Sequence, residues 1–329
     1  MVVNEKILLH RSFINYFKKL NDRELPSSLI NTLEYLKALR DLVKDYFIEN
    51  TQALEKAVIT TLNLVIRSRP TAFMIINVMA RILSEIYKQK EISRDKILEI
   101  INNYISLLSN VPVRIHKHFM KAIENSSVLL VYSFSTTLLE LFRRANRKDI
   151  RIIYIYDDFT EYDYDFVMEL KRYGINISLA PLNAIMATCS TADTILMGSE
   201  AVFYDGSILN RTGSSIIALV ARRLKKKTYV ISAELKVTPI SSSAEIMTSS
   251  LTPPSLSSRY PELTFLHIPI HEIVPADGID YIILESGLLK PKDIKVYLDD
   301  LYKHNKEDIL RYGNLLWKAL NYNIYARRN

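Results

Sequence analysis

The sequence is poor in glycine, which makes up only 7 of its 329 residues, and none of the seven precedes Gly174. Average glycine usage is about 7%. Phosphate-binding loops of the GxGxxG and GxxxxGK[ST] kinds need glycine, because their backbone turns tightly and closely approaches the phosphate. The sequence therefore excludes a nucleotide-binding loop of either kind from its first half.

Cysteine and long apolar runs are also scarce. The single cysteine, Cys189, cannot form an internal disulfide, which fits a reducing compartment. Charged residues interrupt the N-terminal stretch MVVNEKILLHRSF, so it lacks the apolar core of a secretory signal. No segment approaches the ~20 apolar residues of a membrane span. We therefore expect a cytoplasmic protein with no membrane part.

The rest of the composition is that of a globular protein, with 48% hydrophobic and 24% charged residues. At about 150 residues per domain, the length predicts two domains. The net charge of +7 favours acidic partners without selecting their class. Glutamine occurs only at Gln52 and Gln89, a composition resembling that of archaeal or thermophile proteins.

Apolar residues recur three and four positions apart in the first part of the chain, as at Leu29, Leu33 and Leu36. This spacing predicts amphipathic helices from about residue 27 to residue 124, with prolines between them. We expect a helical domain over residues 1–124 and a second domain over residues 125–329. The predicted helices cover roughly 27–47, 52–67, 71–88, 94–109 and 113–124.

After residue 127 the pattern changes to short β-branched and aromatic runs that mostly alternate with helical segments. This alternation predicts an α/β domain with a doubly wound, mostly parallel sheet. The tail from Pro291 reads as helical, and we expect it to pack on the sheet or on a partner. The predicted strands are 128–132, 150–156, 175–180, 194–197, 228–232, 264–268 and 280–284, and the predicted helices are 136–146, 162–173 and 213–226.

Two segments of the second domain admit two interpretations each. The Ser-, Thr- and Pro-rich segment 238–262 is either a lid over a site or a surface excursion. Five acidic residues after the second strand form either a magnesium or ribose-hydroxyl site or a group that the dipole of a helix N-terminus favours. These acids are Asp157, Asp158, Glu161, Asp163 and Asp165.

Three other features carry little chemistry. His116 and His118 lack further ligands at zinc-site spacing, so we expect no metal site. Cys189 has no base or cation beside it, which predicts a small buried residue and not a nucleophile. The basic run 222–227 lies at a helix end, where cations complement the dipole, and we expect no direct nucleic-acid binding.

The most informative stretch is 192–214, which holds three of the seven glycines. It predicts a strand ending at Gly198, a tight Asp205-Gly206 turn and then a helix start. A hairpin that needs glycine for positive φ explains the turn but leaves Glu200 and Arg211 without a role. We therefore expect Arg211 and the first amides of the helix to face a ligand.

This stretch resembles the signature of the translation initiation factor 2B alpha/beta/delta family, whose members share a GADAI-like strand end, an NG turn and an NKxGT helix start. Other segments resemble the family's RPTA helix start, its THSYSST-like end of the first strand and its late DyIITexG strand, in the same order. The resemblance spans roughly residues 60–300. The matching segments are 69–72 (RPTA), 131–137 (VYSFSTT), 198–202 (GSEAV), 205–206 (DG), 210–214 (NRTGS) and 280–287 (DYIILESG).

The resemblance implies a helical N-terminal domain and a Rossmann-like C-terminal domain. The same family contains isomerases of methylthioribose phosphate and ribose bisphosphate, whose catalytic cysteine and aspartate fall on Ser133 and Glu200 here. A hydroxyl is far less acidic than a thiol, and glutamate moves the carboxylate by about one methylene. The isomerases' Arg-Gly-Ala loop is absent around residues 26–29, and Phe159-Thr160 replaces their Arg-Pro pair. We therefore interpret Ser133 and Glu200 as vestigial.

The resemblance thus implies a non-catalytic regulatory subunit that binds initiation factor 2, through its alpha subunit, and related subunits. It also implies a homodimer or higher oligomer formed through the C-terminal domain, and no cofactor. Two alternatives stay open: a divergent sugar-phosphate isomerase with Glu200 as base, and a sensor of sugar phosphates or nucleotides. The predicted pocket, a relic or a regulatory site for a small phosphorylated ligand, comprises Arg69, Ser133, Ser135, Glu200, Asn210 and Arg211.

Overall fold

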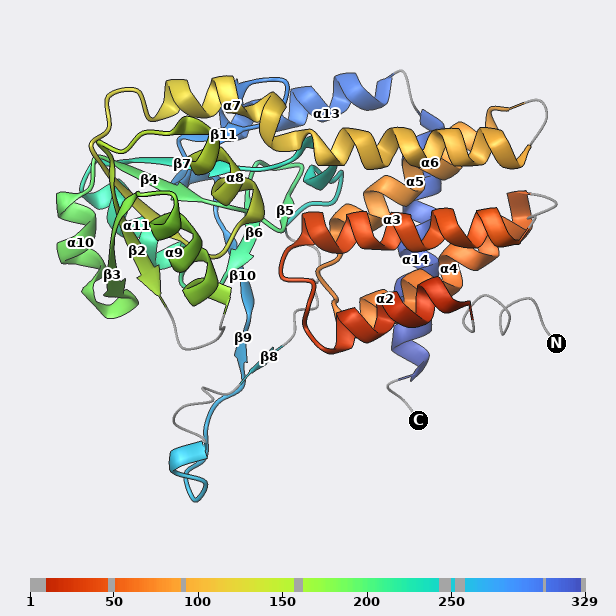
Figure 1. The fold of residues 1–329 in the computed structure, drawn as a ribbon, viewed down its shortest axis with the longest axis horizontal. Coiled ribbons are helices and arrows are strands. Elements are labelled where there is room, and N and C mark those ends of the chain that lie inside the picture. Colours follow the sequence, from red (N-terminus) through yellow and green to blue (C-terminus); the bar gives the residue numbers. More distant parts are fainter. Residues whose placement is uncertain are drawn as a thin grey trace. The chain divides into compact units, whose positions relative to one another are not determined.

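The computed structural model describes residues 10–46, 51–89, 93–156, 162–242, 250–251, 258–303 and 306–326. The chain forms two compact units, one comprising Met1–Asn110 with Asp299–Asn329 and the other Val111–Leu298 (Figure 1). The boundaries between these units follow residues 110 and 298, whereas the sequence predicts a single boundary after residue 124. The helix that follows residue 110 belongs to the sheet unit, and the chain after residue 298 returns to the helical unit.

In the helical unit, residues spaced three and four apart form the helix faces that meet in the core. Helix α3 contacts α2, α5 and α6 and buries Tyr35, Leu36 and Leu39. The helices predicted within this unit are confirmed to within a few residues, while α2 is an additional one. The helices are α2 (Arg11–Asn21), α3 (Ser28–Asp45), α4 (Thr51–Ser68), α5 (Phe73–Tyr87), α6 (Arg94–Ser109) and α14 (Lys306–Ala326).

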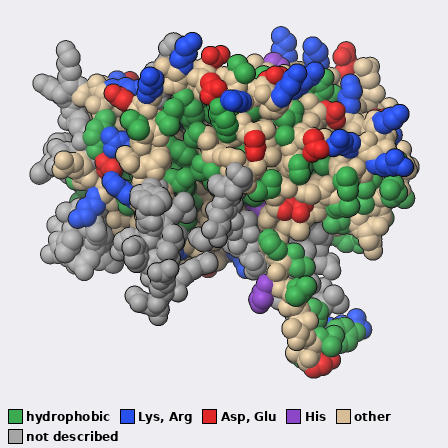
Figure 2. All heavy atoms as spheres, turned by 180° about the vertical axis from the view of Figure 1, so that it is seen from behind, with side chains coloured by type: hydrophobic (Ala, Val, Ile, Leu, Met, Phe, Trp, Pro, Cys, Tyr) green, Lys and Arg blue, Asp and Glu red, His purple; other side chains and the backbone are tan. Residues whose placement is uncertain are grey.

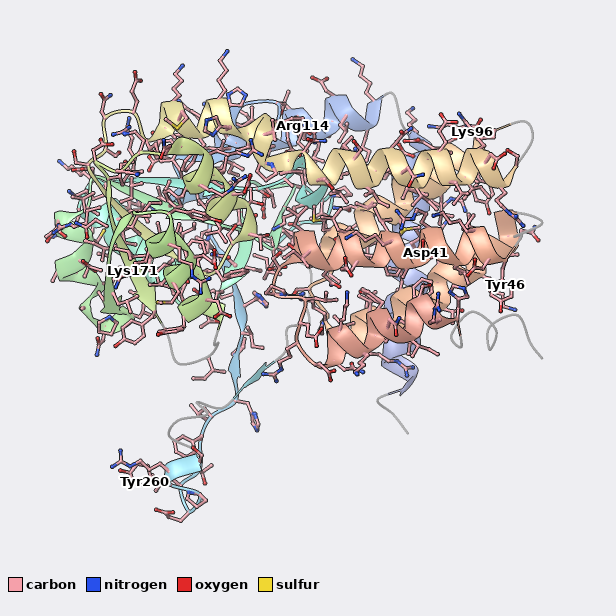
Figure 3. The ribbon with its side chains drawn as sticks, viewed as in Figure 1. Asp41, Tyr46, Lys96, Arg114, Lys171 and Tyr260 are labelled. Carbon is pink, nitrogen blue, oxygen red and sulfur yellow. The ribbon has the colours of Figure 1, made fainter. Side chains whose placement is uncertain are left out.

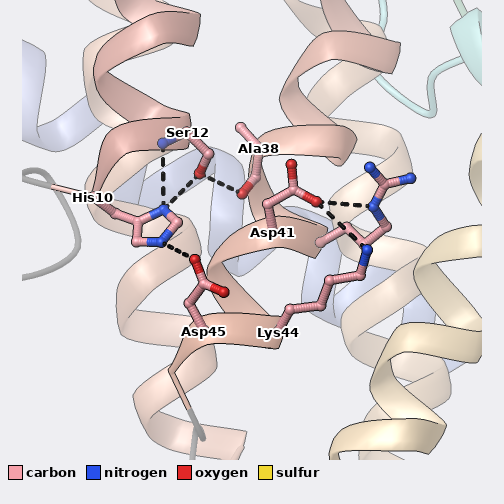
Figure 4. Close-up of polar contacts among 7 residues, drawn as sticks. His10, Ser12, Ala38, Asp41, Lys44 and Asp45 are labelled. Carbon is pink, nitrogen blue, oxygen red and sulfur yellow. Dashed lines mark hydrogen bonds and ion pairs between the residues drawn. The ribbon is translucent and has the colours of Figure 1, made fainter.

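Polar contacts fix the start of α2 against α3 (Figure 4). The backbone N–H of Ser12 donates to Nδ1 of His10, and the Ser12 hydroxyl donates to the Ala38 carbonyl at 2.8 Å. On the other side of the imidazole, Nε2 lies 3.1 Å from a carboxylate oxygen of Asp45. The His10 side chain thus satisfies an amide that the helix itself leaves unpaired.

The C-terminal helix α14 packs against α4 and α5 of its own unit, whereas the sequence predicts packing on the sheet or on a partner. Its Leu315 is buried in the helical core. At the surface, Glu55 of α4 pairs with Arg311 at 2.9 Å and with Lys318 at 3.3 Å. The prediction was wrong because an apolar helix face indicates that something covers it but not what does.

The second unit contains a seven-stranded sheet in the order β12-β11-β7-β4-β1-β2-β3. All neighbours pair in parallel except β11 and β12. Its central strands are almost entirely buried, as expected for a sheet covered on both faces. The strands are β1 (Val128–Tyr132), β2 (Arg151–Tyr156), β3 (Asn176–Pro181), β4 (Thr194–Met197), β7 (Lys227–Ile231), β11 (Tyr281–Ile283) and β12 (Leu288–Leu289).

Helices cover this sheet in two layers (Figure 1). In one layer α8 contacts both α7 and α9, and in the other α10 contacts α11. The doubly wound α/β prediction is confirmed, although the sequence pattern does not predict α10. The helices are α7 (Val111–Ala122), α8 (Thr136–Ala145), α9 (Tyr162–Arg172), α10 (Ile185–Thr191) and α11 (Ser214–Arg223), with short 3-10 turns at 182–184, 234–236, 276–278 and 291–293. Helix α13 (Ile294–Lys303) contains the unit boundary at residue 298.

A small antiparallel sheet lies beside the main one, in the order β10 (His271–Val274), β6 (Ile208–Arg211), β5 (Ala201–Val202). The turn predicted at Asp205-Gly206 joins β5 to β6. Gly206 has φ +80°, and a Cβ there would lie 2.2 Å from the Pro291 carbonyl oxygen. Only glycine fits this turn.

The strand predicted over 264–268 does not form. Regular pairing is confined to the short β9 (Ile268–Pro269), which pairs with β8 (Ser250–Leu251). Leu266 is 83% exposed, so the apolar residues of this run have no layer to cover. An alternating pattern is not enough to form a strand where tertiary packing is missing.

Candidate functional site

The candidate site lies at the carboxyl ends of β1 and β4, which are neighbours in the sheet. From β1 the chain goes on to β2 and β3 on one side, and then crosses to β4 on the other. Open α/β sheets bind ligands in the crevice that opens at such a reversal of strand order. The predicted residues Ser133, Ser135 and Glu200 all follow these two strands.

The loop after β1 has a constrained backbone. Ser133 is buried and has φ +73°, a left-handed conformation that costs a residue with a side chain on the order of 1–2 kcal/mol. Ser135 begins α8, and its hydroxyl accepts the N–H of Leu138 at 3.2 Å. The Ser135 side chain is therefore already used in capping the helix.

The loop after β4 packs directly against this helix start. A Cβ at Gly198 would lie 3.4 Å from the Cβ of Ser135, so the two strand ends are in close contact. The hydroxyls of Ser199 and Ser232 lie 2.9 Å apart, and Lys236 donates to the Ser199 carbonyl. These contacts hold the β4 end to the loop after β7.

Glu200 lies at the start of the small sheet. Its N–H donates to the Leu209 carbonyl at 2.8 Å, and its Oε2 is shielded from solvent. The carboxylate thus projects from a fixed backbone position at the sheet's carboxyl edge. A shielded carboxylate there has the placement that a general base needs.

Arg211 makes a buried ion pair inside the unit. Its Nη1 lies 2.6 Å from a carboxylate oxygen of Asp163, and the exposed fractions of the two side chains are 9% and 6%. The other oxygen of Asp163 accepts the Tyr154 hydroxyl at 2.6 Å. The guanidinium that the sequence analysis directs at a ligand is therefore neutralised by a residue of the acidic group.

Asn210 ties β6 to α11. Its side-chain N–H donates to the Ser214 hydroxyl at 2.8 Å, and that hydroxyl donates to the Arg211 carbonyl at 2.7 Å. All three residues are buried. The amide of Asn210 thus serves the connection between strand and helix.

The first amides of α11 bind a carboxylate of the chain itself. One oxygen of Glu272, on β10, accepts the N–H of Gly213 at 2.9 Å and that of Ser215 at 2.7 Å. Helix N-termini attract anions, because their amides are unpaired and the dipole is positive there. Glu272 occupies the place that a phosphate or carboxylate ligand would take.

Close packing fixes the geometry at this helix start. Gly213 has φ +107°, and a Cβ there would lie 2.7 Å from the Tyr132 hydroxyl and 2.8 Å from a methyl carbon of Leu182. Glycine is thus required twice, by conformation and by space. The concentration of glycine in 198–213 reflects the packing of this edge.

Arg69 belongs to the helical unit. It follows α4, and its Nη1 donates to the Leu25 carbonyl at 2.9 Å. Its place in a common site with the residues of the sheet unit stays a prediction, as do the ligand-binding roles of the other predicted residues.

A second group of charged residues, which the sequence analysis does not identify, joins the ends of β7 and β11 to α7. Glu285 accepts the N–H of Glu234 at 2.7 Å, and Glu234 in turn accepts the N–H of Ser286 at 2.8 Å. The other oxygen of Glu285 lies 3.2 Å from Arg114 of α7, labelled in Figure 3. Burial raises the pKa of Glu285 to about 7.

The remaining predicted features either form no metal site among the described residues or lie outside them. Within the described part of the chain, no group of three or more His, Cys, Asp or Glu residues is arranged to hold a metal ion. Cys189 is buried, and burial raises its pKa, which reduces its reactivity. Asp157, Asp158, Phe159-Thr160 and Glu161 lie outside the described residues, as does much of the segment 238–262. No described helix is long and apolar enough to cross a membrane.

Sequence reasoning missed Glu272 and Asp163 as partners of the candidate site. Glu272 lies 59 residues beyond the amide it accepts from, and Asp163 lies 48 residues before Arg211. Pairings over such distances leave no local pattern. The one available signal was the acidic group at 157–165, which predicts either a magnesium or ribose-hydroxyl site or a group favoured by the helix dipole.

Curated relatives include two kinds of protein. Ribose 1,5-bisphosphate isomerase of Methanocaldococcus jannaschii is 23% identical over 236 residues, which cover 70% of this chain and 76% of the relative. Translation initiation factor eIF2B subunit delta of Dictyostelium discoideum is 20% identical over 327 residues, covering 91% of this chain. This chain spans about half the length of that subunit, 53%.

Solved structures share the fold. The crystal structure of the Pyrococcus horikoshii OT3 translation initiation factor eIF-2B matches with a TM-score of 0.72 and 18% identity, covering 87% of this chain and 99% of that one. A chain of the tetrameric eIF2B-beta2-delta2 complex from C. thermophilum matches with a TM-score of 0.67 and 17% identity, covering 92% and 96%. The model of the initiation factor 2 subunit family, IF-2B, matches residues 26–291. With its helical unit, its doubly wound sheet and this match over most of its length, the chain belongs to the initiation factor 2 subunit family.

Proposed function

We propose that this chain is a non-catalytic regulatory subunit of the initiation factor 2B alpha/beta/delta kind. In this proposal it acts by binding initiation factor 2, through its alpha subunit, and related subunits. It assembles with a second copy through the sheet unit. The observation that carries the proposal is that carboxylates of the chain itself already pair with the groups that could bind an anion at the carboxyl edge of the sheet, a guanidinium and the first N–H groups of a helix.

Two contacts support this reading. Asp163 neutralises Arg211, and Glu272 accepts the first amides of α11. A sugar phosphate at this edge would have to displace both carboxylates, and displacing a buried hydrogen-bonded partner is costly. Ser133, held in a left-handed conformation, offers a hydroxyl where proton transfer needs a more acidic group.

Mixing the purified chain with purified initiation factor 2 tests the proposal, with the mass of the complex measured by light scattering. We expect a complex at tens of micromolar, and its loss when initiation factor 2 lacks the alpha subunit. The matched control is initiation factor 2 lacking a different subunit. No complex with intact initiation factor 2 at this concentration would refute the proposal.

A second candidate function is isomerisation of ribose 1,5-bisphosphate or methylthioribose phosphate. It is favoured by the relatives named ribose 1,5-bisphosphate isomerase and by the shielded carboxylate of Glu200. Turnover of either substrate, abolished by Glu200→Gln, would establish this function in place of the first. The proposal expects no turnover.

A third candidate, a sensor of sugar phosphates or nucleotides, differs in expecting binding without chemistry. A ligand present at 100 times its dissociation constant stabilises the folded state by about 2.7 kcal/mol. A thermal-shift series with sugar phosphates and nucleotides would reveal it as a rise in melting temperature. Our proposal expects no such rise.

A further inference from the structure

Strand β3 forms an open edge of the main sheet. It comes last in the strand order, and among the described residues the only strand that pairs with it is β2. None of its six residues is buried, whereas every residue of β4 is. The outward N–H and C=O groups of an edge strand form a template on which another extended chain can pair.

The sequence of β3 lacks the features that usually protect such an edge, which are charged side chains, proline and a very short strand. The opposite edge combines all three, because β12 has two residues and Lys290 and Pro291 follow it directly. Charged residues make up 24% of the sequence, yet none occurs from residue 173 to residue 192. The proline of β3, Pro181, is its last residue. The sheet is thus protected at one edge and open at the other.

Apolar side chains lie exposed along this edge. Leu179 on β3 is 52% exposed, and Tyr156 at the end of β2 is 39% exposed. Met186 on α10, the helix that follows β3, is 55% exposed. Figure 2 shows hydrophobic side chains gathered at the edge of this unit where α10 lies. An added strand would cover Leu179, because side chains of neighbouring strands pack side by side.

The amino end of β3 carries positive charge. Arg151, the first residue of β2, is in register with Asn176, the first residue of β3. The Cε of Lys148 lies 3.7 Å from the Cβ that Gly174 would carry. The carbonyl of Lys171, labelled in Figure 3, accepts the N–H of Gly174 at 2.9 Å. All three cations are exposed, and among the described residues none of them forms an ion pair.

The acidic residues nearby in the sequence are already paired, Asp149 with Arg147 and Glu169 with Arg172. At the other end of β3 the chain is uncharged over residues 182–192. A partner that complements this edge therefore has acidic residues beside the amino end of β3 and no charge beside the rest of the strand.

We propose that β3 binds an extended, uncharged segment of an acidic partner protein by adding it to the sheet as a further strand, an activity that does not depend on the proposed function. Backbone hydrogen bonds to β3 would supply the affinity. Acidic residues that flank the segment would pair with Lys148, Arg151 and Lys171. Antiparallel pairing is slightly more stable than parallel pairing, so we expect these acids to follow the added strand.

Charge favours such a partner over a second copy of this chain. The net charge of +7 attracts an acidic protein and repels a copy. A copy that paired through its own β3 would bring no acidic residue to this edge, because residues 173–192 are uncharged. Lys148, Arg151 and Lys171 would then stay unpaired.

Fluorescence anisotropy of the labelled synthetic peptide TVTLTDDED, titrated with the full chain from about 1 to about 300 µM, tests this inference. The peptide joins an uncharged strand-forming stretch to acidic residues. We expect a dissociation constant on the order of 100 µM or lower. The control for backbone pairing is TVPLTDDED, whose proline removes a donor, and the control for charge is TVTLTKKRK. Each control should bind at least about 10-fold more weakly.

Two variants locate the site, each with a matched control. Arg151→Glu should raise the dissociation constant of TVTLTDDED at least about 10-fold, whereas Lys227→Glu makes the same change at the exposed first residue of β7 and should leave it unchanged. Leu179→Asp should also raise it, and Val113→Asp, at an exposed apolar position of α7, should not. Far-UV circular dichroism checks folding, and Ser178→Asp replaces Leu179→Asp if the latter does not fold.

Failure of TVTLTDDED to bind at the highest concentration would overturn the inference. Equal binding of TVPLTDDED would overturn the added strand, and equal effects of Arg151→Glu and Lys227→Glu would overturn the choice of β3. Sedimentation equilibrium without peptide tests the other occupant, since a dimer that Leu179→Asp dissociates would show that the edge takes a second copy. Binding of initiation factor 2 is measured separately, so the two proposals fail independently.

Discussion

At the scale of single residues, two carboxylates determine which cationic and N–H groups at the sheet's carboxyl edge are already paired. Asp163 pairs with the buried guanidinium of Arg211, and Glu272 takes the amides that start α11. Each supplies from within the chain the negative charge that a ligand would otherwise bring. The side chains of Asn210 and Arg211 are thus already paired with groups of the chain itself, as the proposed regulatory role expects.

Replacing Asp163 with asparagine should strongly destabilise the sheet unit. The change leaves a buried guanidinium facing a neutral amide, and breaking such a pair costs about 3–5 kcal/mol. The free energy of unfolding, measured in urea, should fall by that order. Asp165→Asn, on the same helix but exposed, is the control and should change it by less than about 0.5 kcal/mol. An equal loss of unfolding free energy in the two variants would show that the buried ion pair contributes no more to stability than the exposed carboxylate does.

Glu285 should make stability depend on pH. Burial raises its pKa from 4.5 to about 7, so between these values the folded chain holds a proton that the unfolded chain releases. The stability that protonated Glu285 contributes is therefore fully present below pH 4.5 and is lost as the pH rises to about 7. This is a change in the free energy of unfolding on the order of 3 kcal/mol. Urea unfolding of Glu285→Gln across pH 5 to 7.5 should lack this decline.

The exposed Glu262→Gln variant is the control for that experiment and should keep the wild-type dependence. Identical pH profiles for Glu285→Gln and the wild type would contradict the raised pKa. Since only the difference between profiles is interpreted, the titration of other carboxylates cancels.

At the scale of elements, backbone geometry decides the turn between β5 and β6. Gly206 has φ +80°, and a Cβ there would lie within 3 Å of three backbone atoms of Pro291. Making room for a Cβ would require the turn or the backbone of Pro291 to shift, and either shift costs free energy. The turn residues Asp205 and Gly206 were predictable from sequence, whereas the close approach of residue 291 was not.

Gly206→Ala should therefore lower the free energy of unfolding by more than about 1 kcal/mol, the least that an unsuited backbone conformation costs. Gly313→Ala is the matched comparison, because Gly313 lies within α14 with nothing within 4 Å of its added Cβ. That change should stabilise the protein by about 0.5–1 kcal/mol. Thermal unfolding of the two variants should shift in opposite directions, and shifts in the same direction would contradict the argument.

At the scale of the whole molecule, the chain crosses between its units twice. The helical unit takes its last helix, α14, from the C-terminal end of the sequence, and α14 packs on α4 and α5. The stability of the helical unit thus depends on residues 256 positions apart in the sequence, Glu55 and Arg311. A division at residue 124 would have separated them.

Leu315→Ala tests this division. Leu315 is 1% exposed, and truncating a buried leucine costs about 2–5 kcal/mol. Hydrogen exchange should show lost protection in α4 and α5 and little change in the main sheet. Leu310→Ala, on the same helix at 69% exposure, should leave protection unchanged. Loss of protection confined to the sheet would contradict the assignment of α14 to the helical unit.

The sequence by itself determined the class of fold, the positions of most helices and six of the seven strands of the main sheet; it did not predict β12. These follow from apolar spacing at 3.6 and 2 residues and from glycine and proline, which act locally. It also placed Ser133, Ser135 and Glu200 after strands of the main sheet, and parallel strands bring such residues to the carboxyl edge of that sheet.

Only the tertiary structure decided what these residues contact. Asp163 and Glu272 are separated from their partners by about 50 residues in the sequence, and α14 is separated from α4 by many more. A side chain's partner depends on which surfaces meet in space, and no local pattern encodes that. The run at 264–268 failed to become a strand for the same reason, since its apolar residues meet no layer of the fold.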